Sequence, residues 1–128
     1  MAISGYERMG WLRASVGVAL VVAPRLPMRV SGREVPTGST ALLMRTIGIR
    51  DLVLGLGTVA ASRTPGTTDE RRWTTAALAS DALDTVVSLA SSRSIGKRDA
   101  VGAALLALGF ALADVVVLRA EAPDPVAP

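Results

Sequence analysis

Seven charged residues of both signs lie inside the apolar segments of this 128-residue chain. They are Arg13, Arg45, Arg50, Asp51, Asp81, Asp84 and Asp114. One charge at the centre of a membrane helix costs about 2.5–3.5 kcal/mol on insertion scales, so seven unpaired charges would cost roughly 20 kcal/mol, more than the stability of a small domain. These residues must therefore pair with one another, face water or meet a partner's charges. The sequence predicts an intramembrane charge network inside an all-α integral membrane four-helix bundle.

The composition fits membrane helices better than a water-soluble core. Half of the residues are hydrophobic but only 3% are aromatic, and Ala, Val, Leu and Gly dominate, as in helices that pack through small side chains. The chain has no Cys and no His, which excludes thiol and imidazole chemistry and removes the commonest zinc ligands. We therefore expect no catalytic residue, no metal and no cofactor.

The net charge of +3 comes almost entirely from arginines scattered at the ends of the apolar segments. Because they form no single patch, the sequence does not predict nucleic-acid binding. Basic residues that flank apolar segments more often lie among anionic lipid headgroups, so membrane lipids are expected partners.

Proline, glycine and charged breaks divide the chain into four apolar segments within a single membrane domain, 1–128. The expected helices are 6–23, 39–62, 68–92 and 99–119, followed by a proline-rich tail at 120–128. Three prolines preclude a continuous helix through 24–38, which we place at the membrane surface. Thr67 and Glu70 have the spacing of a capping box, which starts the third helix near Thr68.

The depths of the charges within their helices suggest how they pair. The second and third expected helices run antiparallel, which brings their middle positions together. The expected pairs are Arg50 with Asp81 or Asp84, Arg45 with Asp84, and Arg13 with Asp114. Three interpretations stay open: the pairs fix helix register, the carboxylates form a proton or ion relay, or some charges pair with another subunit.

Small residues offer three strips along which helices can approach closely. The helix-packing residues are Gly10, Ala14, Gly48, Gly55, Gly102 and Gly109. Four helices have limited internal surface, so we expect one strip to face a partner. Gly55, Gly57 and Ala60 also match the dinucleotide pattern G-x-G-x-x-A, with Asp81 about twenty residues on. No strand is expected before them, so helix packing explains these glycines better.

The segment 45–56, RTIGIRDLVLGL, is the most distinctive string. With Asp81 and Asp84 it resembles the R-x-x-G-x-R-D-x-x-L-G-L pattern of DUF4267-type proteins, which are small four-helix membrane proteins of the wider DoxX-like group. The resemblance covers the second and third helices and implies a four-helix bundle without established chemistry. The length and layout also look like a small accessory subunit of a mycobacterial Mce lipid importer. Thirteen arginines against one lysine are typical of the GC-rich genomes of actinobacteria.

We therefore expect a non-catalytic accessory or regulatory subunit of a larger complex, a lipid transporter, in the plasma (inner) membrane. Its partners would be membrane lipids and the larger membrane-protein complex. One alternative is a small proton-coupled transporter that uses Asp51, Asp81 and Asp84. Another is a DoxX-like redox accessory protein.

Overall fold

The computed structural model describes residues 3–30, 38–64 and 68–122, and within these ranges the chain forms helices and no strand. The helices are α1 (Gly5–Val22), α2 (Leu26–Val30), α3 (Gly38–Ser62), α4 (Asp69–Ala90), α5 (Ser92–Ile95) and α6 (Lys97–Ala120). The expected all-α fold is confirmed. The four long helices begin and end within about two residues of the expected ranges.

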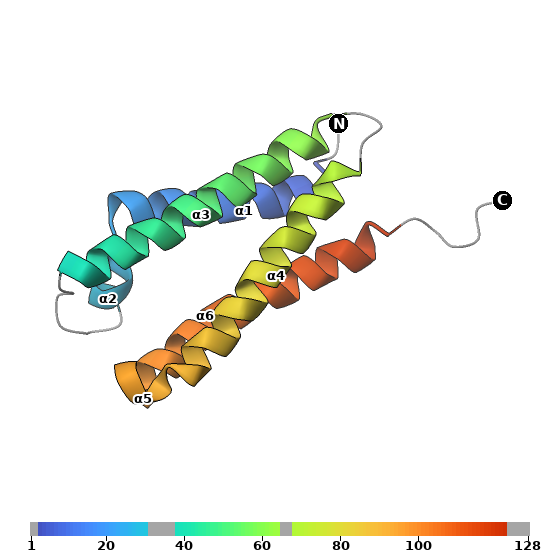
Figure 1. Ribbon diagram of the computed structural model, residues 1–128. Coiled ribbons are helices and arrows are strands. Elements are labelled where there is room, and N and C mark those ends of the chain that lie inside the picture. Colours follow the sequence, from blue (N-terminus) through green and yellow to red (C-terminus); the bar gives the residue numbers. More distant parts are fainter. Residues whose placement is uncertain (1–2, 31–37, 65–67, 123–128) are drawn as a thin grey trace.

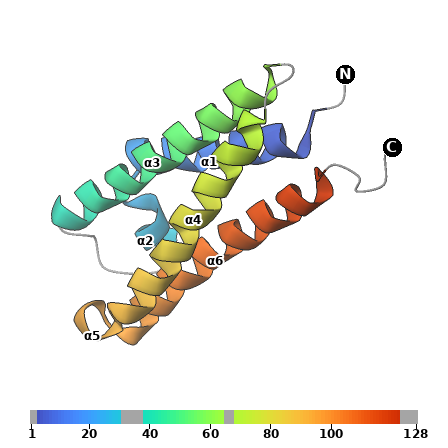
Figure 2. The same cartoon turned by 45° about the vertical axis from the view of Figure 1, so that its right-hand side comes forward.

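The four long helices are arranged as two pairs (Figure 1). α1 packs along α3, and α4 packs along α6, whereas α3 and α4 share a smaller contact and α1 touches α6 and α4 only locally. Figures 1 and 2 both show the short helices α2 and α5 at the same end of the molecule. At the other end the Gly5 amide donates a hydrogen bond to Glu121 Oε1 at 2.6 Å, so the start of α1 meets the end of α6.

Local sequence explains how α1 and α4 begin. Ser4 Oγ accepts a hydrogen bond from the Glu7 amide at 3.1 Å, which satisfies one free donor at the start of α1. α4 begins at Asp69 with Thr68 as its N-cap, which makes no side-chain capping bond. Thr67, the expected capping residue, lies outside the described residues.

The connection between α4 and α6 differs from the expectation of one helix over 68–92. α4 ends at Ala90, and the single turn α5 leads to Gly96, whose φ of 87° lies in the left-handed region that glycine tolerates. α6 then begins at Lys97. Residues 123–128 of the proline-rich tail and residues 31–37 of the 24–38 linker lie outside the described residues, as do Pro65 and Gly66, where the sequence predicts a turn. The described part of that linker contains α2, whose Pro27 lies in the first turn, where a missing amide is tolerated.

Glycines bring α1 and α3 into backbone contact. A Cβ on Gly10 would lie 2.8 Å from the Gly55 carbonyl oxygen, and one on Gly17 would lie 2.6 Å from that of Gly48. Both pairs are seven residues apart along their helices, so the antiparallel helices match glycine against glycine twice. The buried Ala14 lies between them. No side chain larger than hydrogen fits at these crossing points.

The interior is built from small and charged residues, and the large apolar residues lie outside. The buried apolar residues are mostly alanines, whereas Arg13, Asp51, Asp81 and Asp114 are each at most 4% exposed. Exposed large apolar residues occur along all four long helices. They include Leu12, Val18, Leu42, Ile49, Val53, Leu83, Val86, Leu105, Leu106, Leu112 and Val116. A water-soluble domain normally has the opposite distribution.

Average composition singles out one helix. Among the described residues, only α6 is long and apolar enough to cross a membrane by this criterion, with a mean hydropathy of 2.4 over its best window. α1, α3 and α4 fall short because each contains charged residues, among them Arg13, Arg50, Asp51 and Asp81.

Candidate functional site: a buried charge cluster

Six charged side chains from the four long helices meet in the middle of the molecule. This charge cluster consists of Arg13 from α1, Arg50 and Asp51 from α3, Asp81 and Asp84 from α4, and Asp114 from α6. It has an enclosed inner part and a more open edge. The side chains of Arg13 and Asp114 are 2% and 1% exposed, whereas those of Arg50 and Asp84 are 29% and 40% exposed.

Arg13 is the centre of the inner part. Its Nη1 donates a hydrogen bond to Asp81 Oδ1 at 3.3 Å, and its Nη2 contacts Asp81 Oδ2 and donates to Asp114 Oδ2 at 2.9 Å. Asp51 Oδ1 lies 3.5 Å from Nη1. The guanidinium carbon also lies 4.9 Å from the ring centroid of Phe110, a cation–π distance. One cation from α1 therefore connects α3, α4 and α6.

Arg50 closes the cluster at its edge. Its Nε and Nη2 donate to Asp51 Oδ1 at 3.2 and 2.9 Å, and its Nη1 donates to Asp84. Asp81 Oδ1 lies 3.7 Å from Nη2. Arg50 thus links α3 to α4 and shares two carboxylates, Asp51 and Asp81, with Arg13.

The cluster contains more carboxylates than cations. Two guanidinium groups face four aspartates, which leaves two uncompensated negative charges when every carboxyl group is ionised. In addition, Asp114 Oδ1 is buried and has no hydrogen-bond partner among the described residues. A buried oxygen without a donor is costly because it has lost its hydration without replacement.

Six of the seven residues that the sequence predicts to form a charge network lie together in this cluster. Arg13 contacts Asp114 as expected, and Arg50 contacts Asp84 and approaches Asp81. The expected pair of Arg45 with Asp84 is not found: Arg45 is exposed, and its Nε donates to the Val21 carbonyl at 3.4 Å. Five residues of α-helix separate Arg45 from Arg50, so the two side chains leave α3 about 140° apart.

Sequence reasoning missed the contacts of Arg13 with Asp81 and Asp51, and the ring of Phe110. A signal for the first was present, because Arg13 and Asp81 both lie near the middle of their helices. It also missed Gly17, although the seven-residue spacing of Gly10 and Gly17 repeats that of Gly48 and Gly55.

The remaining small residues are used in different ways. Gly57, from the dinucleotide-like pattern, lies under Trp73 of α4, and a Cβ there would be 2.5 Å from the indole ring. That pattern falls inside the continuous helix α3, where its glycines serve helix packing. On α6, Gly102 is half-buried, and nothing lies within 4 Å of a Cβ built on Gly109.

The described part of the molecule has pockets at two places away from the charge cluster, and no residue of the cluster lines either of these two. One, of about 440 Å³, lies where α1 ends and α3 begins, and the other, of about 270 Å³, lies beside Arg72, Trp73 and Ala76. No group of three His, Cys, Asp or Glu side chains in the described ranges is placed to hold a metal ion. In the charge cluster the guanidinium of Arg13 occupies the position between the carboxylates.

The chain matches no protein-family model, no curated protein and no solved structure. The resemblance to DUF4267-type proteins therefore stays an expectation.

Proposed function

We propose that this chain is a four-pass membrane protein of the plasma (inner) membrane that acts as a non-catalytic accessory subunit of a larger membrane complex. The membrane part of the proposal is supported by the exposed apolar residues, which lie on α1, α3 and α4 as well as on α6. Contact between these apolar residues and lipid chains carries no hydrophobic penalty, whereas their exposure to water does.

The charges that lower the average hydropathy of α1, α3 and α4 do not oppose this arrangement. Arg13, Asp51 and Asp81 are paired and buried inside the molecule and would not meet the lipid chains. Arg50, whose side chain is 29% exposed, is paired with Asp51 and Asp84 at the edge of the cluster. Helix length is also sufficient. The shortest long helix, α1, has 18 residues and spans about 27 Å, close to the roughly 30 Å hydrocarbon core of a bilayer.

The accessory role is carried by one observation, the open glycine on α6. Gly10 and Gly17 of α1 pack against Gly48 and Gly55 of α3, but Gly109 faces outward beside the exposed Leu105, Leu112 and Val116. We call these four residues the α6 strip. A glycine within a helix costs roughly 0.5–1 kcal/mol relative to alanine, and lipid gains nothing from it. A helix of a neighbouring subunit would gain from the glycine, because the two backbones could pack closely there.

The lipid-transport character of the larger complex is supported only by the likeness in length and layout to small subunits of Mce importers. The subunits that co-purify with the chain test it directly.

Co-purification from native membranes tests the accessory role. The tagged protein, extracted in a mild detergent, should bring large membrane subunits with it at a fixed ratio, and Gly109→Leu should release them. Ala82→Leu, which adds similar bulk to an exposed site on α4, is the matched control and should keep them bound. Both variants should melt close to the wild type. Isolation of the wild-type chain alone, or equal retention by Gly109→Leu, would count against the proposal.

The surplus of carboxylates favours a second candidate, a small proton-coupled transporter. Two uncompensated aspartates, and an Asp114 oxygen with no donor in the described ranges, would together favour a bound proton. Purified protein in liposomes would then dissipate a proton gradient, and Asp114→Asn would abolish that activity. A tight wild-type vesicle would eliminate this candidate and leave the accessory role.

A further inference from the structure

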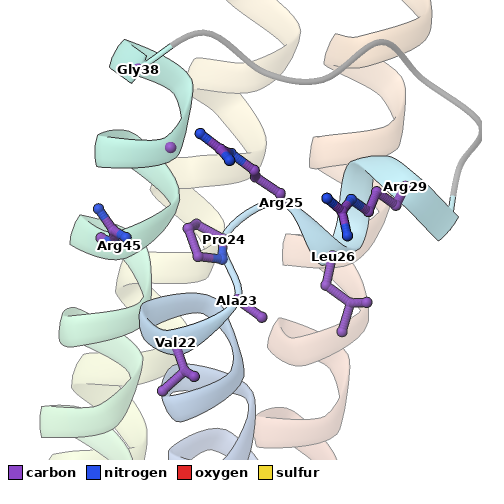
Figure 3. A pocket seen from close by; sticks show the side chains of 9 residues that line it. Val22, Ala23, Pro24, Arg25, Leu26, Arg29, Gly38 and Arg45 are labelled. Carbon is purple, nitrogen blue, oxygen red and sulfur yellow. The ribbon is translucent and has the colours of Figure 1, made fainter.

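The larger pocket lies where the chain turns from α1 into α3. Its volume is about 440 Å³, within the roughly 300–1,000 Å³ usual for small-molecule sites. Three segments form it: the end of α1, the turn with α2, and the first turns of α3. Figure 3 shows Arg25 reaching toward the start of α3 and Arg29 turned back toward the same space from α2. Arg45 contributes the third cation.

Among the residues that the structure describes, the charges that line this pocket are all positive. None of the described acidic residues lines it, and neither Arg25 nor Arg29 forms an ion pair with any described residue. The Nε of Arg45 already donates to the Val21 carbonyl, which satisfies an acceptor at the C-terminal end of α1. The pocket thus gathers three cations, two of them without an acidic partner in the described part of the chain, and like charges held together favour a bound anion.

The other lining residues are small or apolar, including Val22, Pro24 and Leu26. Val22 is 74% exposed and Leu26 is 51% exposed, so an apolar surface continues outward from the cationic pocket. α3 begins at Gly38, one of the lining residues, and its N-terminal end adds partial positive charge. A ligand that suits both features carries an anionic head and an apolar body.

We propose that this pocket, the Arg25–Arg29–Arg45 site, binds a phosphate-bearing anion. Guanidinium groups are the side chains best matched to phosphate oxygens, since they donate two parallel hydrogen bonds. The phosphate has two sources, the headgroup of an anionic phospholipid or free phosphate. The lipid source rests on the proposed membrane position, whereas the phosphate site itself does not.

Native mass spectrometry of the detergent-purified full chain tests the site. The probes are dioleoyl phosphatidylglycerol, dioleoyl phosphatidylcholine and inorganic phosphate. The wild type should retain phosphatidylglycerol in preference to phosphatidylcholine. The triple variant Arg25→Gln, Arg29→Gln, Arg45→Gln should bind it at least about tenfold more weakly, because each basic residue near an anionic lipid adds to the electrostatic attraction.

The control variant removes equal charge from the same end of the molecule but outside the pocket. It carries Arg93→Gln, Lys97→Gln and Arg98→Gln, all at exposed positions, and should bind phosphatidylglycerol nearly as well as the wild type. If the triple variant does not fold, Arg25→Gln with Arg29→Gln keeps the Arg45–Val21 hydrogen bond and serves the same test.

Each outcome decides the proposal. Selective lipid binding that inorganic phosphate does not displace supports a headgroup site, and displacement by millimolar phosphate supports a site for free phosphate. Equal losses in the triple and control variants mean that surface charge alone binds lipid, and they overturn the proposal. Absence of both lipid preference and phosphate binding also overturns it. None of these measurements needs a partner subunit, so failure here leaves the co-purification result of Gly109→Leu standing.

Discussion

Arg13 contacts carboxylates from three other helices, which is more than any other charged side chain among the described residues. Arg13→Leu leaves Asp114 buried without a cation and leaves Asp81 with only the 3.7 Å contact to Arg50. We expect it to destabilise the protein by roughly 3–5 kcal/mol. Arg45→Leu is the matched control, since Arg45 is exposed and outside the cluster, and its effect should be small. Thermal unfolding in detergent measures both. Equal melting temperatures for the two variants would show that Arg13 is not the centre of the network.

The surplus of carboxylates leads to a second expectation at this scale. Asp81 accepts hydrogen bonds from both terminal nitrogens of Arg13. Asp114 accepts through one oxygen, and its other oxygen has no partner among the residues that the structure describes. Asp114→Asn removes one uncompensated charge, and its amide keeps an oxygen for Arg13. We expect Asp114→Asn to be at least as stable as the wild type and Asp81→Asn to be less stable. The reverse order in thermal unfolding would contradict this charge count.

At the scale of the elements, the glycine pairs set the distance between α1 and α3. A methyl group on Gly55 would lie 2.6 Å from the Gly10 carbonyl oxygen and the Ala14 amide nitrogen, so the backbones must separate to admit it. We expect Gly55→Ala to cost about 1–3 kcal/mol, as overpacking usually does. Gly109→Ala meets nothing within 4 Å and should gain about 0.5–1 kcal/mol of helix stability. Melting temperatures that shift equally would mean that the helices are not in contact at Gly55.

The elements also show what the sequence could predict. Proline and glycine breaks are local signals, so the four long helices were found with nearly correct ends. The contacts of a side chain depend on its direction around the helix as well as on its depth. A comparison of depths alone predicted the wrong pair of Arg45 with Asp84. The same comparison would have suggested the pair of Arg13 with Asp81, which was not among the expected pairs. Nothing local distinguished the short turn α5 from the end of α4, because its residues, SRSI, also suit a continuing helix.

For the whole molecule, the two ends of the helix bundle carry different charge. Among the described residues, the end with α2 and α5 has six basic residues and one acidic residue. These are Arg25, Arg29, Arg45, Arg93, Lys97 and Arg98, with Asp99. The opposite end has five basic and four acidic residues. These are Arg8, Arg63, Arg71, Arg72 and Arg119, with Glu7, Asp69, Glu70 and Glu121. We therefore expect the α2 and α5 end to lie at the anionic cytoplasmic surface.

The central claim is that four helices cross the membrane around a paired charge cluster, and side-specific cysteine labelling in intact cells tests it most directly. The chain has no cysteine, so each single-cysteine variant reports one position. Ser39→Cys and Ser94→Cys should label from one side, and Thr68→Cys and Ala122→Cys from the other. All four positions are exposed. Labelling of Ser39→Cys and Thr68→Cys from the same side would contradict the claim, because α3 would then not cross the bilayer.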